Sequence, residues 1–206
     1  MYIVRPSYIF RKIYPKAIWK MSGSEKAIYL TFDDGPIPEL TPWVLETLKA
    51  FQAKVTFFCV GNNVQLHPTI YKQILDDKHA VGNHTFNHLN GWTTNTIEYL
   101  NNINKCAELV DSKMFRPPYG KLKKSHYSLL TTHYSLIMWD VLSGDFDKNT
   151  SREKCLSNVI ENTREGSIVV FHDSLKAKEN LYYALPRFLE HFSAKGYSFK
   201  TINFIG

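Results

Sequence analysis

The chain has 206 residues, enough for one domain with a sizeable core. Its hydrophobic fraction of 44% and charged fraction of 21% exclude a disordered chain, and no apolar stretch is long enough for a transmembrane helix. The net charge of +6 comes from scattered lysines and arginines without a basic block, so we expect no nucleic-acid partner.

The first 20 residues alternate basic side chains with aromatic and aliphatic ones. The charges interrupt every stretch that could serve as the apolar part of a secretory signal. We therefore expect residues 1–26 to pack over the domain as a strap, with weak contact to a membrane surface as the alternative. On these grounds the sequence predicts a cytoplasmic protein, and we expect a monomer.

Seven apolar segments suit buried strands, and helix-like segments separate them. The strand segments are 27–32, 55–60, 79–82, 114–116, 135–139, 167–171 and 197–202. Helices are expected from the Thr41-Pro42 pair onward and at about 68–77, 96–111, 123–132, 152–163 and 180–195. Repeated strand–helix units indicate an α/β fold with a parallel sheet, either open or closed into a barrel, in a single domain over 27–206.

Ionisable residues follow five of these strands. They are Asp33 and Asp34, His84 and His88, Arg116, Asp145, and His172. Because parallel strands deliver the side chains at their carboxyl ends to one face, we expect these residues to converge on one site.

Two of these groups have the chemistry of a metal site. His84 and His88 are four residues apart, a spacing that lets two imidazoles reach one ion, although surface histidines also occur at this spacing by chance. Asp33 and Asp34 are adjacent carboxylates, which repel each other unless a cation or an arginine compensates. The alternative is an Asp-Gly-Pro turn that the aspartates only cap. The three cysteines have neither disulfide nor zinc-site spacing.

Five motifs in order carry a family resemblance. They are TFDDGP at 31–36, HTFNH at 84–88, RPPYG at 116–120, WDVLSGDF at 139–146 and IVVFHD at 168–173. Together they resemble the NodB-homology polysaccharide deacetylases, carbohydrate esterase family 4. The resemblance, with the seven strand segments, implies a single distorted, incompletely closed (β/α)7-type barrel.

The resemblance also implies a role for each motif residue. Asp34, His84 and His88 would hold one divalent metal ion, usually zinc, with cobalt, nickel or manganese as alternatives. Asp33 would be the general base and Arg116 its partner, while His172 would be the general acid, held by Asp145. Tyr119, Phe146, Ile168 and Val170 would contact the substrate.

The fourth motif departs from the family pattern. Leu142 replaces the first aspartate of Asp-x-x-Asp-Trp and Phe146 replaces the tryptophan, while Asp140 lies two residues earlier. The histidine-holding role is therefore assigned to Asp145 alone.

The expected function is that of a metal-dependent hydrolase, a polysaccharide or oligosaccharide N-deacetylase, acting on an N-acetylated amino-sugar glycan or glycolipid. The same site could instead remove a formyl group or an O-acetyl ester from a sugar. A catalytically silent glycan-binding homologue is the alternative from another class. A serine hydrolase is discarded, since Gly-x-Ser-x-Gly is absent from the sequence.

Overall fold

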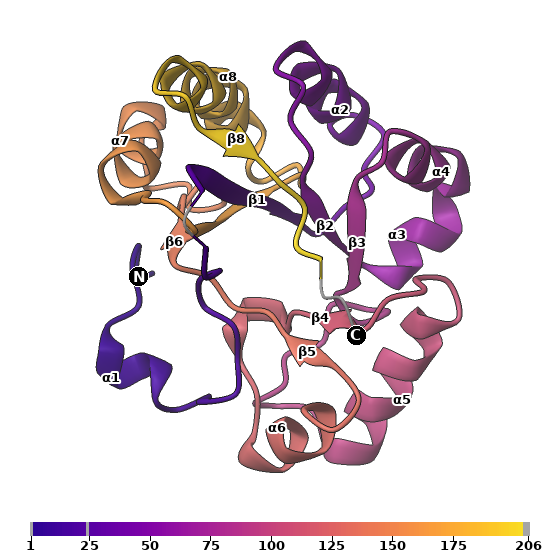
Figure 1. Cartoon of the computed structure of the whole chain (residues 1–206). Helices are drawn as coiled ribbons and strands as arrows, with labels where there is room; N and C mark the ends of the chain where they lie inside the picture. The colour runs from indigo at the N-terminus through magenta and orange to yellow at the C-terminus, as the bar shows by residue number, and fades with distance from the viewer. Residues whose placement is uncertain (1, 24, 204–206) are drawn as a thin grey trace.

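The computed structural model describes residues 2–23 and 25–203 (Figure 1). The strands are β1 (Ala27–Asp33), β2 (Thr56–Cys59), β3 (Ala80–Asn83), β4 (Met114–Phe115), β5 (Ser135–Leu136), β6 (Val141–Leu142), β7 (Ile168–His172) and β8 (Ser198–Phe199). The helices are α1 (Tyr8–Arg11), α2 (Thr41–Ala50), α3 (Gly61–Leu66), α4 (Pro68–Asp76), α5 (Thr96–Ala107), α6 (Lys124–Leu130), α7 (Arg152–Asn162) and α8 (Lys178–Ala194), with a short 3₁₀ turn at Pro118–Gly120.

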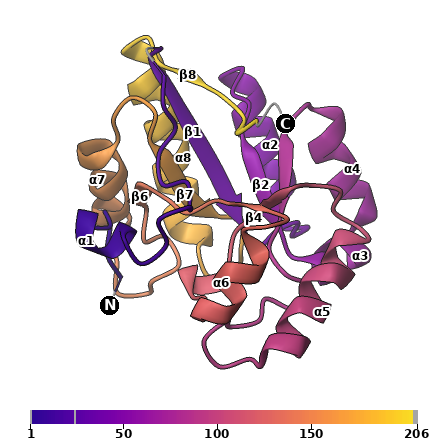
Figure 2. The same cartoon turned by 60° about the horizontal axis from the view of Figure 1, so that its bottom comes forward.

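The strands form one parallel sheet in the order β5-β4-β3-β2-β1-β7-β6, and β8 pairs with the start of β1. The sheet curls with helices along its outer side, and Figures 1 and 2 show the opening between β5 and β6. This arrangement confirms the predicted distorted, incompletely closed α/β barrel.

The main core lies between the sheet and the helices. Phe32 of β1 stacks between Phe57 of β2 and Phe171 of β7, with ring centroids 5.2 and 6.3 Å away. The long helix α8 buries Leu181, Ala184, Leu185, Phe188, Leu189 and Phe192. This three-and-four spacing is that of an amphipathic helix with one apolar face on the sheet.

The chain crosses the opening of the barrel just after β5, which ends earlier than the predicted strand 135–139. Ile137 still pairs with β4 through Phe115, but Met138 donates its backbone N–H to Ile18, and β6 then pairs with β7. The N-terminal segment fills part of the opening, because Ile18 bridges to Ile137 and Lys20 to Ser167. Within the described residues, no helix combines the length and apolarity that crossing a membrane requires.

Candidate active site and metal centre

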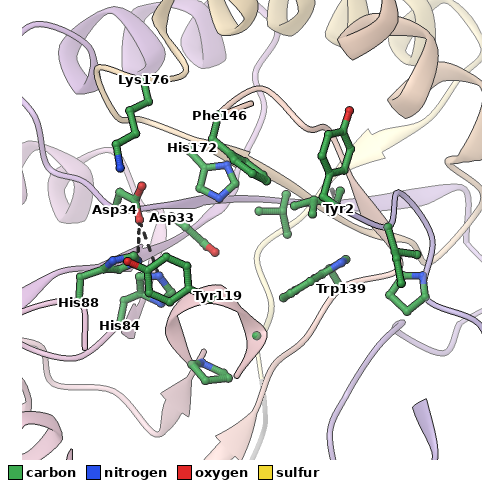
Figure 3. A pocket seen from close by; sticks show the side chains of 16 residues that line it. Tyr2, Asp33, Asp34, His84, His88, Tyr119, Trp139, Phe146, His172 and Lys176 are labelled. Atoms are coloured by element: carbon green, nitrogen blue, oxygen red, sulfur yellow. Dashed lines mark ion pairs between the residues drawn. The ribbon is translucent and has the colours of Figure 1, made fainter. Parts of the chain in front are cut away.

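A pocket of about 360 Å³ opens at the carboxyl ends of the strands (Figure 3). Asp33 and His172 end β1 and β7 inside it, and Asp34, His84 and His88 lie along one side. The loops after β1, β3 and β7 thus deliver their ionisable residues to one pocket, as the strand-end argument expects.

Asp34, His84 and His88 are arranged as a metal-binding trio. One ligand atom from each lies within 4.8 Å of the other two, and an Asp34 carboxylate oxygen is 3.2 Å from His88 Nε2 and 3.8 Å from His84 Nε2. His84 Nδ1 is 2.7 Å from the backbone oxygen of Arg116, so the ring turns Nε2 toward Asp34. One carboxylate with two imidazoles is a donor set that suits zinc and leaves positions open.

The charge states of this trio suit metal binding. Burial lowers the pKa of His84 to about 4, so its imidazole is neutral, the form that coordinates metals. Burial alone would raise the pKa of Asp34, but a hydrogen bond with His88 and the nearby histidines bring it well below its ordinary value. Asp34 therefore offers a carboxylate.

The backbone at the site is unusually strained. Six non-glycine residues in the described chain have a positive φ, and Asp34, Thr85, His88 and Tyr119 are four of them. Thr85 accepts the N–H of Leu89 on its hydroxyl, which braces the loop between the two histidines. Strain of this kind persists where the surroundings fix it, and it concentrates at functional sites.

Asp33 lies beside a fully buried arginine. Arg116 has no exposed surface and donates to Asp33 Oδ1 at 2.6 Å, to the Thr31 hydroxyl at 2.8 Å and to backbone oxygens of Ile137 and Met138. The guanidinium also lies over the Phe58 ring, 4.0 Å from its centroid. Arg116 therefore holds Asp33 in one orientation and balances its charge.

His172 is held by Asp145 through two contacts. Its Nδ1 lies 2.7 Å from Oδ1, and its backbone N–H donates to Oδ2 at 2.7 Å. Burial would lower the pKa of His172, but the Asp145 carboxylate outweighs it and raises this pKa to about 9. Because Nδ1 faces Asp145, Nε2 is the ring nitrogen that can reach a substrate. The Phe146 ring packs edge-on against this imidazole, with the two ring centroids 4.9 Å apart.

Asp173 supports the loop of the first motif, residues 31–36, through side-chain hydrogen bonds. It is buried, and it accepts the Gly35 N–H at 3.0 Å and the Thr41 hydroxyl at 2.6 Å. A Cβ on Gly35 would lie 1.9 Å from this carboxylate, so the contact requires glycine. Asp173 thus fixes the loop that carries Asp34.

The four expected substrate contacts fall in different places. Tyr119, Phe146 and Val170 all line the pocket, and Tyr119 is 58% exposed and packs against His88 at 4.7 Å. Ile168 instead lies in a core cluster with Phe58. It shares a face of β7 with Val170 but lies two residues farther from the carboxyl end, about 6.6 Å along the strand.

Several pocket residues have no signal in the sequence that marks them. Tyr2, Ile3 and Pro6 come from the N-terminal segment, and Lys176 follows the fifth motif. Trp139 lies within the fourth motif and could have been chosen on that ground. The N-terminal residues could not, since their contacts lie about 140 residues away in the chain.

Comparisons with known proteins agree with this geometry. The model of a family described as polysaccharide deacetylase matches residues 20–133. A peptidoglycan-N-acetylglucosamine deacetylase of Bacillus cereus is 33% identical over 192 residues, 90% of each chain. A chitooligosaccharide deacetylase of Azorhizobium caulinodans is 32% identical, over 78% of this chain and 80% of that one. Among solved structures, the Bc1960 peptidoglycan N-acetylglucosamine deacetylase, in complex with a naphthyl-substituted N-hydroxybenzamide, has a TM-score of 0.87 at 29% identity and covers 96% of this chain and 95% of its own.

Proposed function

Because this chain belongs to the polysaccharide deacetylase family, we propose that it hydrolyses N-acetyl groups on an amino-sugar glycan with a divalent metal ion, usually zinc, at Asp34, His84 and His88. One observation carries the proposal. The trio of ligands, the Asp33–Arg116 pair and the Asp145–His172 pair all open into a single pocket. A pure binding protein would need neither pair.

Asp34, His84 and His88 would hold a divalent ion, which would supply the Lewis acidity that acidifies a water and polarises the acetyl carbonyl. Asp33 takes the proton from the attacking water. Since Arg116 occupies Oδ1 of Asp33, Oδ2 is free to accept it.

His172 serves the leaving group. After the new C–O bond has formed, the C–N bond breaks, and Nε2 of His172 donates its proton to the departing amine nitrogen. The products are acetate and a free amine. Asp145 keeps His172 protonated at neutral pH, because it raises the pKa of the ring to about 9.

The test is mass spectrometry of acetylated oligosaccharides, peptidoglycan fragments and glycolipid precursors after incubation with zinc-loaded enzyme. A loss of acetyl mass from at least one amino sugar is expected. Formylated and O-acetylated sugars belong in the same panel, since turnover of these alone would replace the proposal with a deformylase or an esterase. A folded, metal-loaded protein that releases no acid from any of them would be a silent homologue.

A further inference from the structure

The N-terminal segment forms the end of the active-site pocket that lies away from the metal-binding trio. Tyr2, Ile3 and Pro6 all line the pocket. In Figure 3, His172 and Asp33 lie between the trio on one side and Tyr2 and Trp139 on the other. Residues 2–6 therefore belong to the same cavity as the reacting groups.

Hydrogen bonds fix this segment to the fourth motif. Val4 accepts the backbone N–H of Leu142 at 2.8 Å, and the Tyr2 hydroxyl bonds Thr150 at 2.8 Å and Asn158 at 2.9 Å. The Tyr2 ring also packs on Phe146, with centroids 5.6 Å apart.

A glycine makes room for Tyr2. Gly144 has φ +77°, and a Cβ there would lie 2.2 Å from the Tyr2 ring. Only a residue without a side chain allows the ring to approach so closely.

A buried ion pair anchors the segment as well. Asp140 is fully buried, and its Oδ1 accepts from Arg11 at 2.5 Å and from Arg5 at 3.2 Å, while Oδ2 accepts the Ser167 hydroxyl. A buried carboxylate needs such partners, and both arginines come from the N-terminal segment. The segment is thus a fixed wall of the pocket.

This wall creates a region that we name the apolar lobe, bounded by Ile3, Pro6, Trp139, Leu142, Phe146 and Val170. Their side chains offer hydrocarbon, apart from the indole N–H of Trp139, which is buried and has no hydrogen-bond partner among the described residues. A sugar ring placed here would find only this N–H for its several hydroxyl groups and leave the others unpaired, whereas an alkyl chain has no polar group to pair. The lobe therefore suits a hydrocarbon group.

The geometry of the reaction indicates which part of the substrate would enter the apolar lobe. The carbon under attack carries the incoming oxygen, the carbonyl oxygen, the amine nitrogen and the alkyl part of the acyl group. The first two face the trio and Asp33, and the nitrogen faces His172. Figure 3 shows Trp139 and Tyr2 on the side of Asp33 and His172 that lies away from the trio, so the alkyl part would extend toward them.

We propose that residues 2–6 extend the acyl end of the active site, so that this enzyme removes N-propionyl and N-butyryl groups from amino sugars at least as well as N-acetyl groups. This inference rests on the proposed function. Each methylene that the lobe buries should strengthen binding by up to about fourfold.

The experiment uses chitotetraose carrying N-acetyl, N-propionyl or N-butyryl groups. Amine release gives kcat/KM for each substrate, and calorimetry on the Asp33→Asn variant gives their affinities. We expect the butyryl substrate to match or exceed the acetyl one in both. A butyryl kcat/KM below the acetyl value would overturn the inference and leave the deacetylase intact.

A matched pair of variants tests the role of the wall. Ile3→Trp places a large ring at the lobe and should lower the butyryl-to-acetyl ratio of kcat/KM at least fourfold. Ile9→Trp makes the same change on the same segment at a side chain that is 79% exposed and outside the pocket, so the ratio should stay at its wild-type value. Equal ratios in the two variants would overturn the inference. If no substrate releases acid, the proposed function fails, while tighter binding of the butyryl sugar by Asp33→Asn would still support the lobe.

Discussion

Replacing Asp145 with asparagine should lower the pKa of His172, the proposed general acid. Asparagine keeps the shape of the side chain and one oxygen for the His172 backbone N–H, which now contacts Oδ2 at 2.7 Å. It removes the negative charge next to Nδ1. Burial, which lowers the pKa of His172, is then opposed only by the smaller effects of the Asp34 and Asp33 charges, so the pKa should fall.

The largest possible effect follows from the pKa of His172, which lies at about 9 instead of 6.5, with Asp145 making the largest upward contribution and Asp34 and Asp33 smaller ones. At pH 8 a group with that pKa is about 90% protonated, whereas a group with a pKa of 6.5 or below is at most about 3% protonated. Activity that needs the protonated ring should therefore fall at pH 8, by up to roughly thirtyfold.

The assay is kcat/KM against pH, together with an NMR titration of the His172 ring in metal-free protein. In the variant, the basic limb and the ring pKa should both move toward pH 6.5 or lower. A bound metal ion would lower the pKa of the basic limb in the wild type and in the variant alike, so the variant would still have the lower of the two values. Asp147→Asn is the control, because this neighbour lies in the same loop and, among the described residues, its carboxylate accepts only the Asn149 N–H. A basic limb that stays in place in Asp145→Asn would refute the reasoning.

The same pKa predicts how stability depends on pH. A ring whose pKa is higher in the folded state stabilises the fold fully below the unfolded value of 6.5, and this contribution disappears as the pH rises through about 9. It amounts to at most about 3 kcal/mol. In metal-free protein, the stability advantage of wild type over Asp145→Asn should therefore shrink between pH 6.5 and 9.5, as urea unfolding would measure.

Three further substitutions separate the roles in the site. Asp33→Asn should nearly abolish turnover yet leave the metal content unchanged, and loss of metal by mass spectrometry would make Asp33 a ligand. His84→Ala should lower metal content and activity together, and full metal content would remove His84 from the ligand set. Arg116→Met leaves Asp33 buried beside no cation, so the free energy of unfolding should fall by about 3–5 kcal/mol in urea titrations. An unfolding free energy within 1 kcal/mol of wild type would show that Asp33 finds another partner.

The sequence predicted most of the sheet because the buried strands are short apolar runs that end in polar residues. It missed α3 (Gly61–Leu66), whose residues include a glycine and two asparagines with weak helix propensity. Tertiary contacts hold this helix instead, since the N–H groups of Gly61 and Asn62 donate to the backbone oxygens of Thr85 and Phe86. The strand expected at 135–139 ends early for a related reason, namely that Met138 pairs with the N-terminal segment.

The catalytic side of the pocket could be predicted since each residue sits in a motif at a strand end. The opposite side could not, because residues 2–6 reach it through contacts with residues about 140 positions away. Composition shows basic and aromatic residues near the N-terminus, but nothing in their spacing says which part of the barrel they cover.

Leu142 and Asp140 show how the altered fourth motif can still support a working site. Asp145 alone makes both contacts to His172, so the acid does not need a carboxylate at position 142. Leu142 adds hydrocarbon to the pocket instead, and its backbone N–H holds Val4. Asp140 anchors Arg5 and Arg11, which keeps the N-terminal wall against that same pocket. The departure from the family pattern therefore changes the end of the pocket that we propose receives the acyl group and leaves the Asp33–Arg116 and Asp145–His172 pairs in place.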